Sequence, residues 1–278
     1  MSSSSFFCAR RRELSRGRGI GRSIAFIALL ITPGVRAAPF AAGSPDRGAE
    51  IFLAACSGCH GERGDGRSEA AVALIPSPAD LTRGIFRYRS TPTGSLPTDA
   101  DLARTVRFGL PSTAMPAWGG HLAEAQIVDV VAFVKILSPR FARKAPQAPV
   151  EISPETPNDA DSVARGAEIY KQAQCAKCHG EEGRGDGWAK ADELKDDSGQ
   201  VIRPRDFTTG VYRGGASARD LYRTLATGID GTPMPAFETL AAGDLWDLVH
   251  YTLSLTRPRG FWFWLTNPPS WDEPLASR

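Results

Sequence analysis

The stretch CSGCH at residues 56–60 recurs 119 residues later as CAKCH at residues 175–179. A second stretch, MPAW at 115–118, recurs at the same separation as MPAF at 234–237. In each copy the methionine follows the histidine by 55 residues. Two distant motifs that repeat together indicate an internal duplication, with one domain for each copy.

Shorter matches extend the duplication on both sides of these motifs. RGAEIF at 47–52 matches RGAEIY at 165–170, and PADLT at 78–82 matches PRDFT at 204–208. The separations drift between the matches, which places an extra loop near 90–97 in the first copy and a polar insert at 189–200 in the second. Five prolines between residues 139 and 160 predict a stiff, extended linker. The domains expected are 38–138 and 161–257, flanked by a segment at 1–37, the linker at 139–160 and a tail at 258–278.

The pattern of apolar and capping residues predicts helices and loops only, and hence an all-α fold. A first helix should lead into each cysteine pair, from about Asp46 and from about Asp161. A second helix should begin after Thr98 or Ser217 and end at Gly109 or Gly228, because hydroxyl side chains cap helix starts and glycine ends helices. A last helix is expected over roughly 123–137 and 243–255, where apolar residues follow the helical period.

The motif Cys-x-x-Cys-His is the attachment sequence for c-type haem. Two thiols one helical turn apart can reach two vinyl groups on one edge of a porphyrin, and the adjacent histidine can then ligate the iron. We therefore expect two covalently bound haem c groups, one on each copy. The covalent attachment residues are Cys56, Cys59, Cys175 and Cys178, and the iron-ligating histidines are His60 and His179. A four-cysteine zinc site, simple disulfides and a redox-active cysteine pair remain as alternatives.

Met115 and Met234 are the only methionines besides the initiator, and each precedes a proline. Their recurrence at a fixed distance predicts that they supply the sixth iron ligand, although methionine also fills gaps in hydrophobic cores. Histidine and methionine together raise the reduction potential of haem. They also leave no open iron position, which favours electron transfer over oxygen or peroxide chemistry.

These motifs resemble those of the class I cytochrome c family in a tandem diheme form, over about residues 44–257. The resemblance implies two helical domains, each wrapped around one haem, in which the first helix crosses the last. It also implies a protein that is not an enzyme and that carries single electrons between redox partner proteins, as a shuttle or as the cytochrome subunit of a respiratory or oxidoreductase complex. A diheme peroxidase or oxidase and a haem-containing sensing module are the alternatives.

Several loop residues are candidates for contact with the haem propionates, because arginine pairs well with carboxylates. A solvated loop charge is the alternative for each. His121 has no counterpart in the second copy and is expected to be a surface histidine. His250 lies in the last helix, where Ala132 is its counterpart, and is expected to be structural. The candidates for propionate contact are Arg83, Arg87, Arg89, Arg203, Arg205, Arg213, Tyr88 and Tyr212.

The N-terminal segment has the order of features typical of a signal peptide: basic residues 10–22, an apolar run at 24–31, and the small residues Val35 and Ala37 at the −3 and −1 positions of a cleavage site. Cleavage after Ala37 predicts a periplasmic protein, and an uncleaved segment would anchor it to the outer face of the inner membrane. Residues 1–37 contain seven arginines and one acid, so the formal charge of +2 becomes −4 for the remainder. That balance argues against a nucleic acid partner. The aromatic stretch at 261–265 is expected to pack internally or to meet a partner or membrane surface.

Overall fold

The computed structural model describes residues 42–190 and 192–257. All of them belong to one compact unit, Phe40–Arg278. The predicted signal segment at 1–37 and the aromatic tail at 258–278 lie outside the described residues.

The described residues form helices joined by long loops, which confirms the predicted all-α class. Their one pairing of β type is an isolated antiparallel bridge between Lys195 and Val201. The first copy contains α1 (Pro45–Ala55), α2 (Ser57–His60), η1 (Ala70–Ala73), η2 (Leu81–Arg83), α3 (Asp99–Phe108) and α4 (Glu124–Leu137). After α5 (Pro139–Arg143), the second copy contains α6 (Ala160–Gln172), α7 (Cys175–His179), η3 (Phe207–Thr209), α8 (Ala218–Thr227) and α9 (Ala242–Ser254).

The helix starts and stops follow the predicted signals. At the start of α3, Thr98 and Asp101 form a reciprocal capping box, in which each side chain accepts a hydrogen bond from the other residue's backbone. Ser217 caps α8 by accepting a hydrogen bond from the Asp220 amide. Gly109 and Gly228 end these two helices, both at a φ of 64°, in the region that glycine enters without steric cost.

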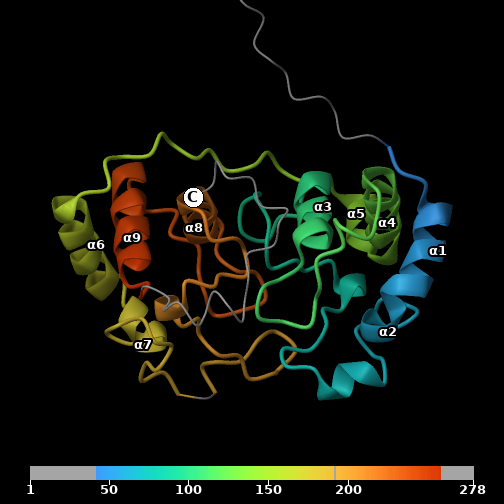
Figure 1. Ribbon diagram of the computed structural model, residues 1–278, viewed down its shortest axis with the longest axis horizontal. Helices are drawn as coiled ribbons and strands as arrows, with labels where there is room; N and C mark the ends of the chain where they lie inside the picture. The colour runs from blue at the N-terminus through green and yellow to red at the C-terminus, as the bar shows by residue number, and fades with distance from the viewer. Residues whose placement is uncertain (1–41, 191, 258–278) are drawn as a thin grey trace, which may run out of the picture. The chain divides into compact units, whose positions relative to one another are not determined.

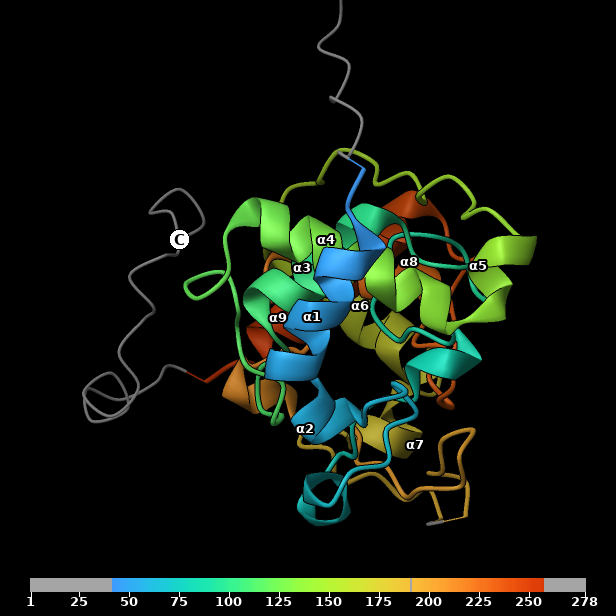
Figure 2. The ribbon, with the colours of Figure 1, turned by 90° about the vertical axis from the view of Figure 1, so that its right-hand side faces the viewer.

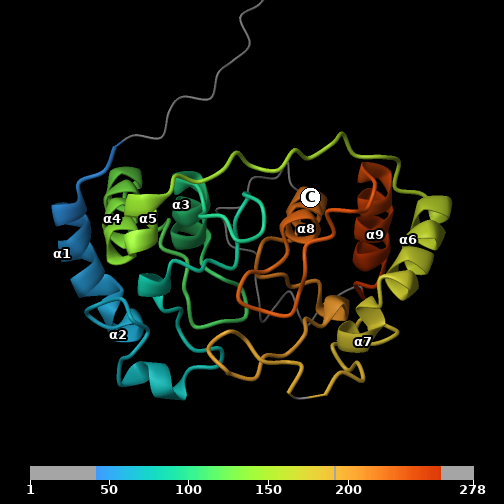
Figure 3. The same cartoon turned by 180° about the vertical axis from the view of Figure 1, so that it is seen from behind.

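The first and last helices of each copy pack side by side, α1 against α4 and α6 against α9 (Figure 1). The view from behind shows the same pairing (Figure 3), and both it and the view turned by 90° (Figure 2) show α2 following the end of α1. A Cβ atom on Gly48 would lie 2.0 Å from the carbonyl oxygen of Asp129, and one on Gly166 would lie 2.0 Å from that of Asp247. Glycine at these two positions therefore permits the close helix crossing.

The predicted linker differs from the expected extended spacer at its start, where residues 139–143 form α5. Pro139 occupies the first turn of that helix, where its missing amide hydrogen costs nothing. The remainder runs from α5 to α6 without regular structure (Figure 1) and contacts both copies. The Val150 amide donates to the Ser90 carbonyl at 2.8 Å. The buried Trp246 donates from Nε1 to Ser153 Oγ at 2.9 Å.

The two copies also contact one another through arginine–aspartate ion pairs. In each of these pairs the arginine belongs to the first copy and the aspartate to the second. The N–O distances are 2.9 Å for Arg83–Asp197, 2.7 Å for Arg87–Asp196, 2.7 Å for Arg89–Asp230 and 2.8 Å for Arg104–Asp220.

Candidate functional site

Each cysteine pair lies on a short helix, or at its N-cap, directly after the first long helix of its copy. Cys56 lies between α1 and α2 as the C-cap of one and the N-cap of the other, and Cys59 and His60 lie on α2. In the second copy α7 contains Cys175, Cys178 and His179. Helical spacing places each pair of sulfurs one turn apart, as attachment to a single porphyrin edge requires. All four cysteines are free thiols and partly buried.

Both candidate ligand histidines are oriented by a backbone carbonyl. His60 Nδ1 lies 3.1 Å from the Ala79 oxygen, and His179 Nδ1 lies 3.0 Å from the Arg205 oxygen. A carbonyl can only accept a hydrogen bond, so Nδ1 is the protonated nitrogen of each neutral ring. Nε2 is then the nitrogen with a free lone pair, and a metal-ligating histidine is commonly oriented by such a contact. Ala79 and Arg205 occupy equivalent positions in the matched stretches, so the duplication reproduces this orientation.

Burial shifts the pKa of these groups toward their neutral forms. It lowers the pKa of His60 and His179, against the weaker opposing effect of the carbonyl contacts. It raises the pKa of both Cys56 and Cys175 to about 11. A redox-active cysteine pair typically has a lowered thiol pKa, and burial acts in the opposite direction on Cys56 and Cys175.

A cavity of about 1270 Å³ adjoins α2 in the first copy. Cys56, Cys59 and His60 line it together with Met115, which comes from the loop between α3 and α4. The apolar part of its lining includes Phe52, Leu81, Phe86, Leu102, Val106, Val130, Val131 and Val134. A large, mostly apolar space with thiols, an imidazole and a thioether on its walls fits a haem.

The loops that contain the two methionines have the same hydrogen bonds. In the first, Leu110 donates from its amide to the Met115 carbonyl at 3.1 Å, and Thr113 Oγ1 accepts from the Met115 amide at 3.1 Å. In the second, Ile229 donates to the Met234 carbonyl at 3.1 Å, and Thr232 Oγ1 accepts from the Met234 amide at 3.2 Å. Each methionine backbone is therefore fixed on both sides.

Aromatic side chains lie near His179 in the second copy, and one of them stacks on it. The Phe207 ring stacks on the imidazole with centroids 4.3 Å apart, and Tyr212 stacks on Phe207 at 5.9 Å. The buried Tyr170 donates its hydroxyl to the Gly180 carbonyl at 2.8 Å, next to the motif. Phe207, which follows Arg205 by two residues, therefore restricts the imidazole on the side of its carbonyl partner.

The arginines considered for propionate contact pair with aspartates, line the cavity of the first copy, or do both. Arg83, Arg87 and Arg89 pair with aspartates of the second copy, a role that the sequence did not indicate, and Arg83 and Arg87 also line the cavity. Arg213 and Tyr88 line the cavity of the first copy, and Nε of Arg213 is buried without a hydrogen-bond partner among the described residues. An unpaired buried guanidinium nitrogen fits the carboxylates of a haem in that cavity.

The remaining candidates lie apart from the ligand sets. His121 is exposed, and the buried His250 lies in α9 with Nδ1 2.6 Å from Ser162 Oγ. Within residues 42–190 and 192–257, no group of three or more histidine, cysteine or acidic side chains is arranged to hold a metal ion. None of the helices in these ranges has the length and apolarity needed to cross a membrane.

Comparisons with known proteins agree with this geometry. Residues 43–134 match the family described as cytochrome c oxidase, cbb3-type, subunit III, and residues 163–256 match the cytochrome c family. The chain is 34% identical over 101 residues to the cbb3-type cytochrome c oxidase subunit FixP of Azorhizobium caulinodans, a match that covers 36% of this chain and 30% of FixP. The chain thus matches less than a third of that relative's length.

A solved structure is similar over most of the chain. It belongs to the Kuenenia stuttgartiensis reducing HAO-like protein complex Kustc0457/Kustc0458. The TM-score is 0.75 at 38% sequence identity, and the match covers 80% of this chain and 100% of the solved one. The chain therefore belongs to the class I cytochrome c family, as an electron-transfer cytochrome with two tandem cytochrome c domains.

Proposed function

We propose that the chain carries two covalently bound haem c groups and moves single electrons between redox partner proteins in the periplasm. The observation that supports this best is the arrangement of His60 and Met115 on the wall of one cavity, together with the Cys56–Cys59 pair. The second domain repeats the histidine contact and the methionine loop with nearly the same distances.

The residues of each domain have separate tasks. Cys56 and Cys59, or Cys175 and Cys178, would form the thioether links. His60 and Met115, or His179 and Met234, would ligate the iron. When bound, haem supplies an iron that accepts and releases one electron. The carbonyls of Ala79 and Arg205 keep each imidazole in one tautomer, and the apolar cavity wall excludes water.

A filled ligand set supports electron transfer rather than catalysis. Both methionines have their backbone amide and carbonyl bonded within their own loop. Neither loop therefore has a feature that would favour dissociation of its methionine sulfur from the iron. A peroxidase or oxidase needs one iron with an exchangeable position. The similarity to FixP and to a chain of a HAO-like complex supports the role of a cytochrome subunit in a larger redox complex over that of a free shuttle.

The test is to express the full chain with a cytochrome c maturation apparatus and to measure the mass of the purified product. We expect the added mass of two haems, low-spin spectra and slow, weak binding of carbon monoxide by the reduced protein. A colourless product would overturn the proposal, and rapid stoichiometric carbon monoxide binding at both sites would overturn the ligand assignment.

Location is tested separately, by fractionating cells and sequencing the N-terminus of the mature protein. We expect release in the periplasmic fraction and a mature chain that starts after Ala37. A chain recovered with the membrane and retaining residues 1–37 would instead support an anchor at the outer face of the inner membrane.

A further inference from the structure

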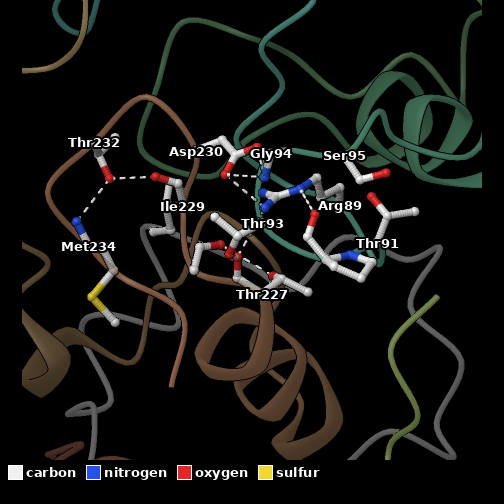
Figure 4. Close-up of polar contacts among 12 residues, drawn as sticks. Arg89, Thr91, Thr93, Gly94, Ser95, Thr227, Ile229, Asp230, Thr232 and Met234 are labelled. Atoms are coloured by element: carbon white, nitrogen blue, oxygen red, sulfur yellow. Dashed lines mark hydrogen bonds and ion pairs between the residues drawn. The ribbon is translucent and has the colours of Figure 1, made fainter. Parts of the chain in front are cut away.

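The Met234 loop, residues 227–234, contacts the first domain through a buried ion pair. Arg89 has a fully buried side chain, and its Nη2 lies 2.7 Å from Asp230 Oδ1 and 3.0 Å from the Thr227 carbonyl oxygen. Figure 4 shows Arg89 reaching the start of the loop that ends at Met234. The guanidinium thus bonds the loop both at its first residue and at its one carboxylate.

A segment of the first domain that the second lacks adds to this contact. This segment, residues 90–96 and here called the brace loop, includes most of the extra loop found in the first copy. Thr93 Oγ1 donates to the Thr227 carbonyl at 2.9 Å, and the Gly94 amide donates to Asp230 Oδ2 at 3.1 Å (Figure 4). Arg89 is itself tied to the brace loop, because its Nε donates to the Pro92 carbonyl at 3.3 Å.

From Asp230 the contacts continue to the methionine. Thr232 Oγ1 donates to the Ile229 carbonyl at 2.7 Å and accepts from the Met234 amide at 3.2 Å (Figure 4). The Ile229 amide in turn donates to the Met234 carbonyl at 3.1 Å. Asp230 therefore lies inside the short turn that fixes Met234, and whatever holds Asp230 limits how far that turn can move.

The Met115 loop has no equivalent brace. Pro111 occupies the position equivalent to Asp230, so the carboxylate is missing. Among residues 42–190 and 192–257, the one hydrogen bond to this loop from the opposite domain runs 2.9 Å from Arg205 Nη1 to Ser112 Oγ, and it is solvent-exposed. A buried ion pair between a guanidinium and a carboxylate restrains a loop more strongly than an exposed hydrogen bond from an arginine to a hydroxyl. The two methionine loops thus differ in how much they depend on the other domain.

We propose that Arg89 is a positioning residue which, from the first domain and through Asp230, keeps Met234 at the iron of the second domain. The inference rests on the proposed function, since it takes Met234 as an iron ligand. Its consequence is directional: ligation in the second domain depends on the first domain, whereas ligation by Met115 is largely independent of the second.

The test compares the Arg89→Gln and Asp230→Asn variants of the full haem-loaded chain with Arg104→Gln. Arg104 is a matched control because it also forms a cross-domain pair, with Asp220 at 2.8 Å, but at the opposite end of α8 from the Met234 loop. The two test variants together separate an effect on the Met234 loop from a failure to fold. Arg89→Gln changes a buried residue of the first domain, whereas Asp230→Asn keeps that arginine and changes only its partner in the loop. Redox titration, the far-red absorption of the methionine–iron bond and carbon monoxide binding are measured, and Met115→Ala and Met234→Ala identify each site.

We expect both test variants to raise the population of dissociated methionine at the Met234 site by roughly tenfold or more, as expected for the loss of a charge-assisted hydrogen bond, and thereby to lower the potential of that site. Because Asp230 also lines the cavity of the first copy, methionine dissociation and not the potential alone is the readout that compares the two sites. Dissociation at the Met115 site should be unchanged, and Arg104→Gln should leave both sites unchanged. Equal methionine dissociation at both sites, or wild-type behaviour of both test variants, would overturn the proposal that Arg89 positions Met234. If Met234→Ala itself changed nothing, the ligand assignment would fail instead.

Discussion

Arg47 and Asp129 form an ion pair in which Nε lies 2.7 Å from Oδ2, and this contact joins the first helix of the first domain to the last. Arg165 and Asp247 form the same pair in the second domain at 2.6 Å. In both pairs the arginine is exposed while the carboxylate is buried. Each pair lies next to the glycine that allows the helices to approach.

The helix crossing predicts the effect of adding one methyl group. Gly166→Ala would place Cβ 2.0 Å from the Asp247 carbonyl oxygen, so α6 and α9 must separate. We expect a loss of about 1–3 kcal/mol in the free energy of unfolding, the usual range for overpacking. Gly243→Ala is the control, because its Cβ would meet open space within the same helix pair. Denaturant unfolding of both variants measures the difference, and equal stability would show that the helices are not in tight contact.

The buried carboxylates predict a loss of stability in acid. The hydrogen bond from Arg165 lowers the pKa of Asp247, and the hydrogen bond from Arg47 lowers the pKa of Asp129. A lowered pKa in the folded state means that the carboxylate stabilises the protein above its unfolded pKa of about 3.9 and that this contribution is lost as the pH falls through the folded value. Asp247→Asn should therefore reduce stability at pH 7 and flatten its decline below about pH 4. A parallel decline in variant and wild type would contradict the assignment.

Replacing each methionine in turn should change the reduction potential of one haem site at a time. Met234→Ala should keep haem attached through Cys175 and Cys178 but lower the potential of that site, because methionine ligation raises it. Met115→Ala should do the same at the other site. Potentiometric titration of both variants checks this, and a site whose potential stays at its wild-type value has a different sixth ligand.

The linker predicts a stability effect far from either ligand set. Ser153→Ala would leave the buried Trp246 Nε1 without its partner at 2.9 Å. An unsatisfied buried donor costs about 1–3 kcal/mol, and the melting temperature should fall accordingly. Glu151→Ala, at an exposed linker position, serves as the control and should stay within about 0.5 kcal/mol of wild type. If both variants melted together with wild type, the linker would not be docked in solution.

Local chemistry accounts for what could be predicted from the sequence alone. The haem motifs, the methionine positions and the helix caps each depend on residues a few positions apart, and the duplication shows them twice. Thr98 and Gly109 mark the ends of α3 because capping and left-handed backbone conformations are local preferences. The helical class and the candidate ligands follow from such signals.

Contacts between residues far apart in the chain were decided by the tertiary structure. Arg89 and Asp230 are separated by 141 residues, and neither differs in composition or local pattern from a solvated loop charge. The histidines are oriented by the backbone carbonyls of Ala79 and Arg205, and no side chain at these positions indicates that contact. A sequence shows which groups can ligate, but only the fold determines which buried charges meet, because desolvation and pairing depend on the chain's path through space.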